Sequence, residues 1–332
     1  MLLKEHEEIK ELVKKSGSIL VVGHIMPDGD CISSVLSAGV GFERLGKKVL
    51  MIVDDEIPWY YYEFPDVARI RTADALGDFG YDLIVVLDAS SPDRVGRVQK
   101  VLGTKTTVVM DHHGTNTMFG DVNLVIPTIG STAQLVFMLN KKLGVHYDPL
   151  LATYNFMGIA TDTGFFRYSN ADLKVFEDAA ELVGFGARPN DISNAILENR
   201  LPEELKLFAD VVANMKLECD GMLAYSYVSR EMFEKYGLPD HSASGFVSEL
   251  RAMKGVEVAI LFTERSDGSI HASMRSKKMF DLREVAVRFG GGGHPQAAGF
   301  SVKGRTLSQV IDEVIPYVVK QLKKAAAREG LL

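Results

Sequence analysis

The sequence predicts an α/β fold: an N-terminal domain with a parallel sheet and flanking helices, a helical connector, and a smaller C-terminal α+β domain. Short runs rich in Val and Ile recur in the first half of the chain, at 18–24, 47–55, 81–90 and 105–113. Helical stretches separate these runs, and strands joined through helices are typical of crossover units in a parallel sheet. From about 170 to 213 the pattern is helical throughout, and hairpin signals follow.

The helices of the first half are placed by the runs on either side and by their end signals. The first is expected from about Cys31 to Leu45, followed by Gly46, a residue typical of helix C-termini. Two more helices are expected after the fourth run, at 131–143 and at about 149–160. Beyond about 170, apolar residues recur every three or four positions, which predicts amphipathic helices.

The second half has a different pattern of apolar and turn-forming residues. Apolar runs flank Asp220-Gly221 and Asp267-Gly268, and each pair of runs predicts a β-hairpin. A glycine run follows, and an amphipathic helix is expected from about Leu307 to Arg328. These patterns predict three parts, a first domain at 1–190, a helical connector at 191–213 and a second domain at 214–332.

The 332 residues carry 37 Lys and Arg against 44 Asp and Glu, a net charge of −7. Residues 1–213 hold 20 basic and 30 acidic side chains, whereas residues 214–332 hold 17 and 14. Proteins that coat duplex nucleic acid normally have a basic face, so the acidity argues against that class. An acidic half joined to a mildly basic half suits metal cations that meet an anionic ligand, although ordinary solvated surface gives the same asymmetry.

The composition has no mark of a membrane or secreted protein. No stretch approaches the roughly 20 consecutive apolar residues that a spanning helix needs. The charged N-terminal segment lacks the apolar core of a signal peptide. The two cysteines, Cys31 and Cys219, give no disulfide framework. A cytoplasmic location, away from membranes, is therefore expected.

Polar residues that a buried core cannot explain follow several of the predicted strands. They are His24, Asp28 and Asp30 after the first run, Asp88 in the third, Asp111-His112-His113 in the fourth, and Asp162 farther on in GIATDTGFF. Ligands of open α/β sheets bind at the carboxyl ends of the strands. Each cluster alone has a simpler reading, since Asp-Gly-Asp is common in turns and an Asp can end a helix. Their occurrence together favours one site.

The chemistry of these residues points to metal ions. Carboxylate and imidazole groups without thiolate suit Mn²⁺ or Mg²⁺, and less often Fe²⁺ or Zn²⁺. Several carboxylates in one pocket raise one another's pKa unless cations compensate. Two divalent ions about 3.5–4 Å apart would provide that charge and would activate water for in-line attack on a phosphate.

The order of these motifs resembles the DHH phosphoesterase superfamily, whose name-giving triplet matches Asp111-His112-His113. In the second half, Met274-Arg275-Ser276-Lys277 and GGGGHPQAAGF at 290–300 resemble the DHH-associated C-terminal domain of nanoRNases and RecJ. The resemblance covers nearly the whole chain. The length is similar to that of the NrnA-like nanoRNase/pAp phosphatase group, which includes phosphodiesterases acting on linear and cyclic di-AMP.

The resemblance implies a set of metal ligands and a catalytic group. One metal would be held by His24, Asp28 and Asp88. The second would be held by Asp30, Asp88, His112 and Asp162, so that Asp88 bridges the two. His113 would either face the substrate phosphate or steady the site from behind the metal ligands, and it is expected, with Asp88 and Asp30, to be catalytic. The implied cofactor is a pair of divalent ions, Mn²⁺ first, with Mg²⁺ or Co²⁺ as alternatives.

Substrate binding is expected mainly from the second domain. Four consecutive glycines make a poor strand or helix interior, so the run predicts a loop whose backbone amides approach a phosphate, with a flexible turn as the alternative. The candidate substrate-binding residues there are Arg275, Ser276, Gly291, Gly292, Gly293 and His294. Arg167, shortly after Asp162, is a further candidate, although a surface salt bridge would also explain it. Trp59 and the tyrosines at 60–62 could stack bases or pack at a subunit interface.

The function implied is a dinuclear-metal phosphodiesterase and phosphatase. It would hydrolyse short single-stranded oligoribonucleotides (nanoRNA and pApA, with cyclic di-AMP as a further candidate) to mononucleotides, and dephosphorylate 3′-phosphoadenosine 5′-phosphate (pAp). A pyrophosphatase or exopolyphosphatase, a longer RecJ-type exonuclease and a non-catalytic nucleotide sensor are the alternatives. The resemblance also suggests a homodimer.

Overall fold

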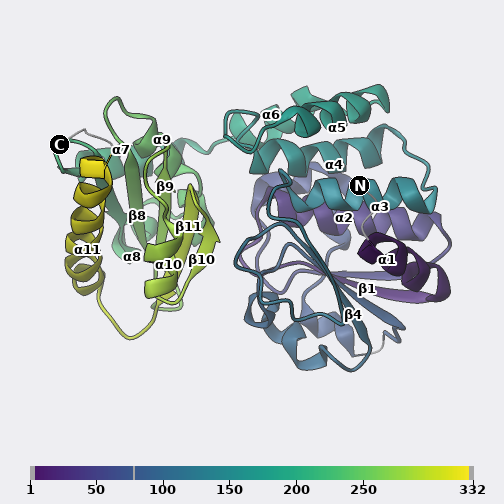
Figure 1. Cartoon of the computed structure of the whole chain (residues 1–332). Helices are drawn as coiled ribbons and strands as arrows, with labels where there is room; N and C mark the ends of the chain where they lie inside the picture. Colours follow the sequence, from purple (N-terminus) through teal and green to yellow (C-terminus); the bar gives the residue numbers. More distant parts are fainter. Residues whose placement is uncertain (1–3, 78, 329–332) are drawn as a thin grey trace. The chain divides into compact units, whose positions relative to one another are not determined.

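The computed structural model describes residues 4–77 and 79–328, and the chain divides into two compact units, Met1–Asn199 and Arg200–Leu332 (Figure 1). The predicted α/β class is confirmed, with a parallel sheet in the first unit and a smaller mixed sheet in the second. The segment 191–213, expected as a connector, is divided between the two units. Its first helix, α6 (Pro189–Leu197), belongs to the first unit, and α7 (Pro202–Ala213) belongs to the second.

The first unit is built on five parallel strands in the order β2-β1-β3-β4-β5. Their bounds are β1 Ser18–Val22, β2 Lys48–Ile52, β3 Leu83–Leu87, β4 Thr106–Asp111 and β5 Val122–Val125. The first four lie within the runs predicted as strands, and β5 was not predicted. β5 is only four residues long and lies at the edge of the sheet, so its apolar signal is weak. The order places the carboxyl ends of β1, β3 and β4 side by side.

α-Helices cover one face of this sheet, and the 3₁₀ segments within 73–101 pack on the other (Figure 1). The α-helices are α1 Lys4–Lys15, α2 Gly29–Arg44, α3 Thr132–Leu143, α4 Pro149–Asp162 and α5 Leu173–Gly184. Ile19 and Val21 of β1 pack in the cluster that contains α2, α3 and α4, whereas Leu20 and Val22 pack against η4 (Pro92–Val101). The alternation follows from the pleat of the strand. Three further 3₁₀ segments are η1 Trp59–Glu63, η2 Pro65–Arg69 and η3 Ala73–Leu76.

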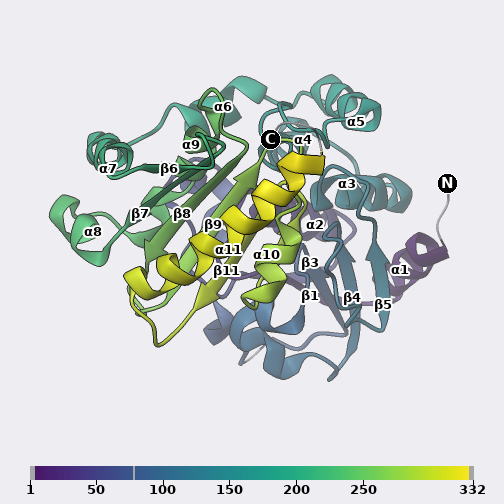
Figure 2. The ribbon, with the colours of Figure 1, turned by 60° about the vertical axis from the view of Figure 1, so that its left-hand side comes forward.

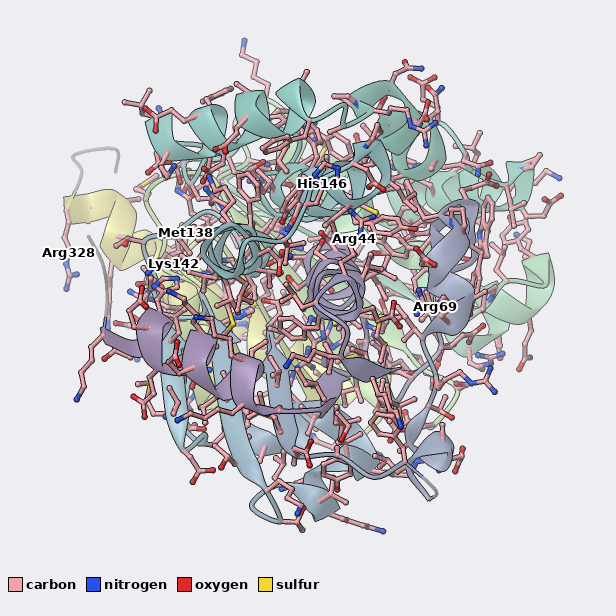
Figure 3. All side chains as sticks on the ribbon, turned by 90° about the vertical axis from the view of Figure 1, so that its right-hand side faces the viewer. Arg44, Arg69, Met138, Lys142, His146 and Arg328 are labelled. Carbon is pink, nitrogen blue, oxygen red and sulfur yellow. The ribbon has the colours of Figure 1, made fainter. Side chains whose placement is uncertain are left out.

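Polar contacts at the surface connect the helices of the first unit to one another. Lys142 of α3, labelled in Figure 3, lies 3.4 Å from the Glu7 carboxylate of α1. Arg44, at the end of α2, donates hydrogen bonds to the His146 carbonyl and to Asp148, which caps α4. Exposed pairs of this kind contribute little to stability individually, so the apolar clusters hold the unit together.

The second unit has six strands in the order β10-β11-β9-β8-β7-β6. They are β6 Lys216–Glu218, β7 Leu223–Val228, β8 Val258–Glu264, β9 Ile270–Ser276, β10 Gly292–His294 and β11 Ala297–Val302. Both predicted hairpins are present, β6–β7 and β8–β9. The helices are α7, α8 Arg230–Tyr236, α9 Phe246–Ala252, α10 Arg283–Arg288 and α11 Leu307–Arg328, with η5 at Asp240–Ala243. α11 runs along the sheet of this unit (Figure 2), and its apolar residues pack in one cluster with those of the strands.

The glycine run was predicted to be a loop, and this prediction is wrong for its last part, which is a strand. Gly292, Gly293 and His294 form β10 and pair with β11. A Cβ on Gly291 would lie 2.1 Å from the Gly299 carbonyl oxygen, and Gly293 has φ +137°. Glycine is therefore required for the close approach of the two strands and for the backbone conformation. The packing that the glycines lack is supplied by the neighbouring backbone.

In the part of the chain that the structure describes, no helix is both long and apolar enough to cross a lipid bilayer.

Candidate metal centre

The predicted ligands of the first unit gather at the carboxyl edge of its sheet. His24 lies two residues beyond β1, Asp88 directly follows β3, and Asp111 is the last residue of β4. Asp28 caps the N-terminus of α2, where its carboxylate accepts the backbone N–H groups of Asp30 and Cys31. Loops that leave three adjacent strand ends thus bring together residues up to 87 positions apart.

The predicted ligands form two groups of side chains that could each hold a metal ion. In the first, His24 Nε2 lies 3.7 Å from Asp28 Oδ1 and 3.5 Å from Asp88 Oδ2. In the second, His112 Nε2 lies 3.7 Å from Asp30 Oδ2 and 3.5 Å from Asp162 Oδ2. Asp162 reaches this group from the end of α4. All of these residues were predicted from the sequence as ligands.

Asp88 lies between the two groups. Its Oδ2 faces His24, and its Oδ1 lies 3.7 Å from His112 Nε2. The backbone of Asp88 is in the left-handed region, with φ +60°, which is unusual for a residue other than glycine. An unfavourable backbone conformation of this kind is maintained by the packing and hydrogen bonds around it, and it is frequent at functional sites.

The N-terminus of α3 holds the buried carboxylates in position. Asp30 accepts the backbone N–H groups of Thr132 and Ala133, over 2.6 and 2.9 Å. The Thr132 hydroxyl donates to Asp88 Oδ1 over 2.9 Å. Gly158 of α4 leaves the room that Asp30 needs, because a Cβ there would lie 2.8 Å from Asp30 Oδ1.

The electrostatics of the cluster fit divalent cations. Burial raises the pKa of Asp30 and of Asp88 well above the usual range, and repulsion among the neighbouring carboxylates adds to the effect. Burial lowers the pKa of His112 to about 4, so its ring is neutral at pH 7, which is the form that binds metal. Oxygen and imidazole donors around uncompensated negative charge are the chemistry that Mn²⁺ and Mg²⁺ accept.

The second histidine of the triplet, His113, is oriented by a separate network. Its Nδ1 lies 2.7 Å from Asp111 Oδ1, which also accepts the backbone N–H groups of both histidines. The Asn116 side chain donates to Asp111 Oδ2 over 2.6 Å and to the Ala89 carbonyl over 3.1 Å. Although burial raises the pKa of Asp111, His113 and these hydrogen bonds hold it below its usual range. Asp111 therefore orients His113.

Two residues of this site, Thr132 and Asn116, escaped the sequence analysis. The pair Ser131-Thr132 resembles a helix cap in the sequence, and Ser131 does accept the Gln134 N–H. The Thr132 hydroxyl, however, is directed to Asp88. Asn116 follows the triplet in an irregular loop, where no periodic signal marks it.

The predicted substrate-binding residues lie in both units. In the first unit, Arg167 is exposed, and its Nε donates to the Gly164 carbonyl over 2.7 Å. In the second unit, Arg275 and His294 both pair in register with Ala297 of β11, which places them on the same face of the sheet. Gly292 and Gly299 lie next to them on that face, and the His271 ring lies 3.4 Å from the position that a Cβ on Gly299 would take. Ser276 instead is fully buried, with its hydroxyl donating to the Phe280 carbonyl.

Fold and site together define an α/β protein with a carboxylate–imidazole centre suited to divalent metal ions. The DHH family N-terminal domain matches residues 18–159, and the DHHA1 domain matches residues 220–324. The chain belongs to the DHH family and is a phosphoesterase.

Relatives and solved structures agree with this assignment. The chain is 32% identical over 318 residues to the bifunctional oligoribonuclease and PAP phosphatase NrnA of Thermus thermophilus, over 96% of this chain and 94% of that protein. It is 26% identical to the cyclic-di-AMP phosphodiesterase PdeA of Listeria monocytogenes, over 93% of this chain and 48% of that protein. The crystal structure of an exopolyphosphatase-related protein from Bacteroides fragilis superimposes with a TM-score of 0.86 at 25% identity, covering 97% and 99% of the two chains.

Proposed function

We propose that the chain is a dinuclear-metal phosphodiesterase and phosphatase that cleaves very short oligoribonucleotides to mononucleotides and dephosphorylates pAp. The observation that carries this proposal is the position of Asp88, whose two carboxylate oxygens face two separate ligand groups. A carboxylate placed in this way suits a bridge between two cations. The similarity to NrnA of Thermus thermophilus, a bifunctional oligoribonuclease and PAP phosphatase, supports the substrate class.

The proposed ligands divide between the two positions. His24, Asp28 and Asp88 would hold one ion, and Asp30, Asp88, His112 and Asp162 would hold the other. Bound there, two divalent ions, with Mn²⁺ favoured over Mg²⁺ and Co²⁺, would lower the pKa of water and stabilise charge on the phosphoryl oxygens. Thr132 and the N-terminus of α3 keep Asp88 and Asp30 in place for this purpose.

His113 supplies the proposed contact with the reacting group. The Asp111 carboxylate accepts a hydrogen bond from its Nδ1 and so orients the ring, with Nε2 at the opposite side of the imidazole. A side chain that is 23% exposed beside a buried centre can reach a phosphate oxygen without leaving the network that orients it. His113 would therefore bind the scissile phosphate and exchange a proton with it at Nε2.

The second unit supplies the proposed substrate recognition. Arg275 and His294 place two donors on one sheet face, next to glycines that let a ligand approach the backbone. In this proposal, the first unit, including 1–190, carries catalysis, and the region 214–332 binds the nucleotide. The net positive charge of residues 214–332 agrees with an anionic substrate.

A substrate panel tests the proposal. Hydrolysis of pApA, a longer nanoRNA, pAp, cyclic di-AMP and pyrophosphate would be measured with Mn²⁺, Mg²⁺ and Co²⁺. Turnover of pApA and pAp with Mn²⁺ is expected. Turnover of pyrophosphate alone would contradict the substrate class, and tight nucleotide binding without any hydrolysis would contradict catalysis.

A further inference from the structure

The segment that follows Asp88 is fixed against the loop that carries His24. The backbone N–H of Ile25 donates to the Arg94 carbonyl over 2.7 Å. At Gly96, with φ +59°, a Cβ would lie 2.9 Å from the Ile25 side chain and 2.8 Å from Asp54 Oδ2. The 3₁₀ segment η4 is thus held tightly to the first group of ligands, and the position of Arg94 follows from this packing.

Two arginines of η4 have different surroundings. Arg97 forms ion pairs with Asp54 at 2.7 Å and with Asp74 at 2.6 Å. Arg94 is half-buried, and within residues 4–77 and 79–328 no carboxylate lies at ion-pair distance from it. Instead, its Nη2 lies 3.2 Å from His24 Nδ1. One arginine therefore has two anionic partners, and the other faces the metal centre without one.

His24 does not offer Arg94 an acceptor. Its Nδ1 lies 2.8 Å from the Ile25 carbonyl oxygen, and a carbonyl can only accept, so Nδ1 carries the proton. With Nδ1 as the donor to Ile25, Nε2 is the nitrogen that faces Asp28 and Asp88, as a metal ligand requires. The guanidinium thus meets an N–H group at the imidazole, and within residues 4–77 and 79–328 no other side chain accepts a hydrogen bond from it.

We propose that Arg94 binds a phosphate group of the substrate at the edge of the metal centre. A guanidinium presents a planar fork of donors that matches phosphate oxygens, and it stays charged at any working pH. The neighbouring carboxylates would otherwise repel a nucleotide, so a cation at this edge favours its approach. The inference rests on the proposed function and adds to it a recognition residue from the DHH unit, which neither motif contains.

The test compares Arg94→Gln and Arg94→Lys with wild type and with Lys100→Gln, which removes one exposed positive charge from the same segment. We expect Arg94→Gln to raise the KM for pApA and the inhibition constant of inorganic phosphate by about tenfold or more. For Arg94→Lys, both constants should lie between those of wild type and Arg94→Gln, because an ammonium group keeps the charge but lacks the planar fork of donors. The concentration of Mn²⁺ that gives half-maximal activity should not change, and Lys100→Gln should behave as wild type.

Each contrary outcome has a distinct meaning. Unchanged KM and phosphate inhibition in Arg94→Gln would overturn the inference. A change confined to the Mn²⁺ requirement would also overturn it, since Arg94 would then only support His24. If wild type hydrolysed none of the substrates, the proposed function would fail. Calorimetric titration of inorganic phosphate into the Mn²⁺-loaded proteins would still decide the inference, which requires weaker binding by Arg94→Gln.

Discussion

The Thr132 hydroxyl donates a hydrogen bond to Asp88 over 2.9 Å and so joins the N-terminus of α3 to the end of β3. Groups that orient a metal ligand in this way commonly change metal affinity by 10- to 100-fold when they are removed. Thr132→Val keeps the shape and removes the donor. We expect it to raise the Mn²⁺ concentration for half-maximal activity by about tenfold.

Ser131→Ala is the matched control for Thr132→Val. It removes the cap of the same helix and should cost about 1 kcal/mol of stability without a comparable change in the Mn²⁺ requirement. Equal Mn²⁺ requirements in Thr132→Val and wild type would show that the hydrogen bond does not position Asp88.

The Asn116–Asp111–His113 network leads to a prediction about the pH profile. Asn116→Ala leaves Asp111 Oδ2 without its side-chain donor, and the orientation of His113 loosens. We expect kcat to fall by about tenfold, with a displaced acid limb in the pH dependence of kcat and an unchanged Mn²⁺ requirement. A change in the Mn²⁺ requirement alone, with the pH profile preserved, would contradict this role.

Gly158 allows a test of the space around Asp30. In Gly158→Ala the new Cβ would lie 2.5 Å from the Ala133 Cβ and 2.8 Å from Asp30 Oδ1. We expect a loss of about 1–3 kcal/mol in the free energy of unfolding, measured with urea, together with weaker Mn²⁺ binding. Gly184→Ala, at an open position of α5, should instead be neutral or stabilise by a few tenths of a kcal/mol. Equal stabilities of the two variants would contradict the steric argument.

His6 in α1 makes the stability of the protein pH-dependent, away from the metal centre. The ring is fully buried, and burial, followed by the nearby charge of Lys142, lowers its pKa from 6.5. Below about pH 6.5 the unfolded chain takes up a proton that the folded protein excludes, so stability falls as the pH falls. The loss is at most about 1.4 kcal/mol per pH unit.

Urea unfolding at pH 7.5 and pH 5.5 tests this prediction. His6→Leu should lose less stability between the two pH values than wild type does, because the buried site no longer titrates. His146→Gln, at an exposed position, should match wild type. An identical pH dependence in wild type and His6→Leu would refute the role of His6.

The sequence places the predicted ligands at one edge of the sheet because several of them stand directly after apolar runs. An apolar run that ends in Asp88 or in Asp111 predicts a buried strand and also marks the carboxyl end of that strand. Thr132 and Arg94 were not predicted, since their contacts with Asp88 and His24 join residues 44 and 70 positions apart. Asn116 was not predicted because it lies in an irregular loop. The strand β10 was also missed, because its pairing depends on close approach of a backbone partner and not on side-chain propensity.

The most direct test of the account is the number of Mn²⁺ ions bound per chain, measured by equilibrium dialysis of wild type, His24→Asn and Asp88→Ala. We expect two ions in wild type and one in His24→Asn. In Asp88→Ala we expect weaker binding at both positions and loss of activity on pApA. One ion in wild type, or full activity in Asp88→Ala, would contradict a centre in which Asp88 joins two metals.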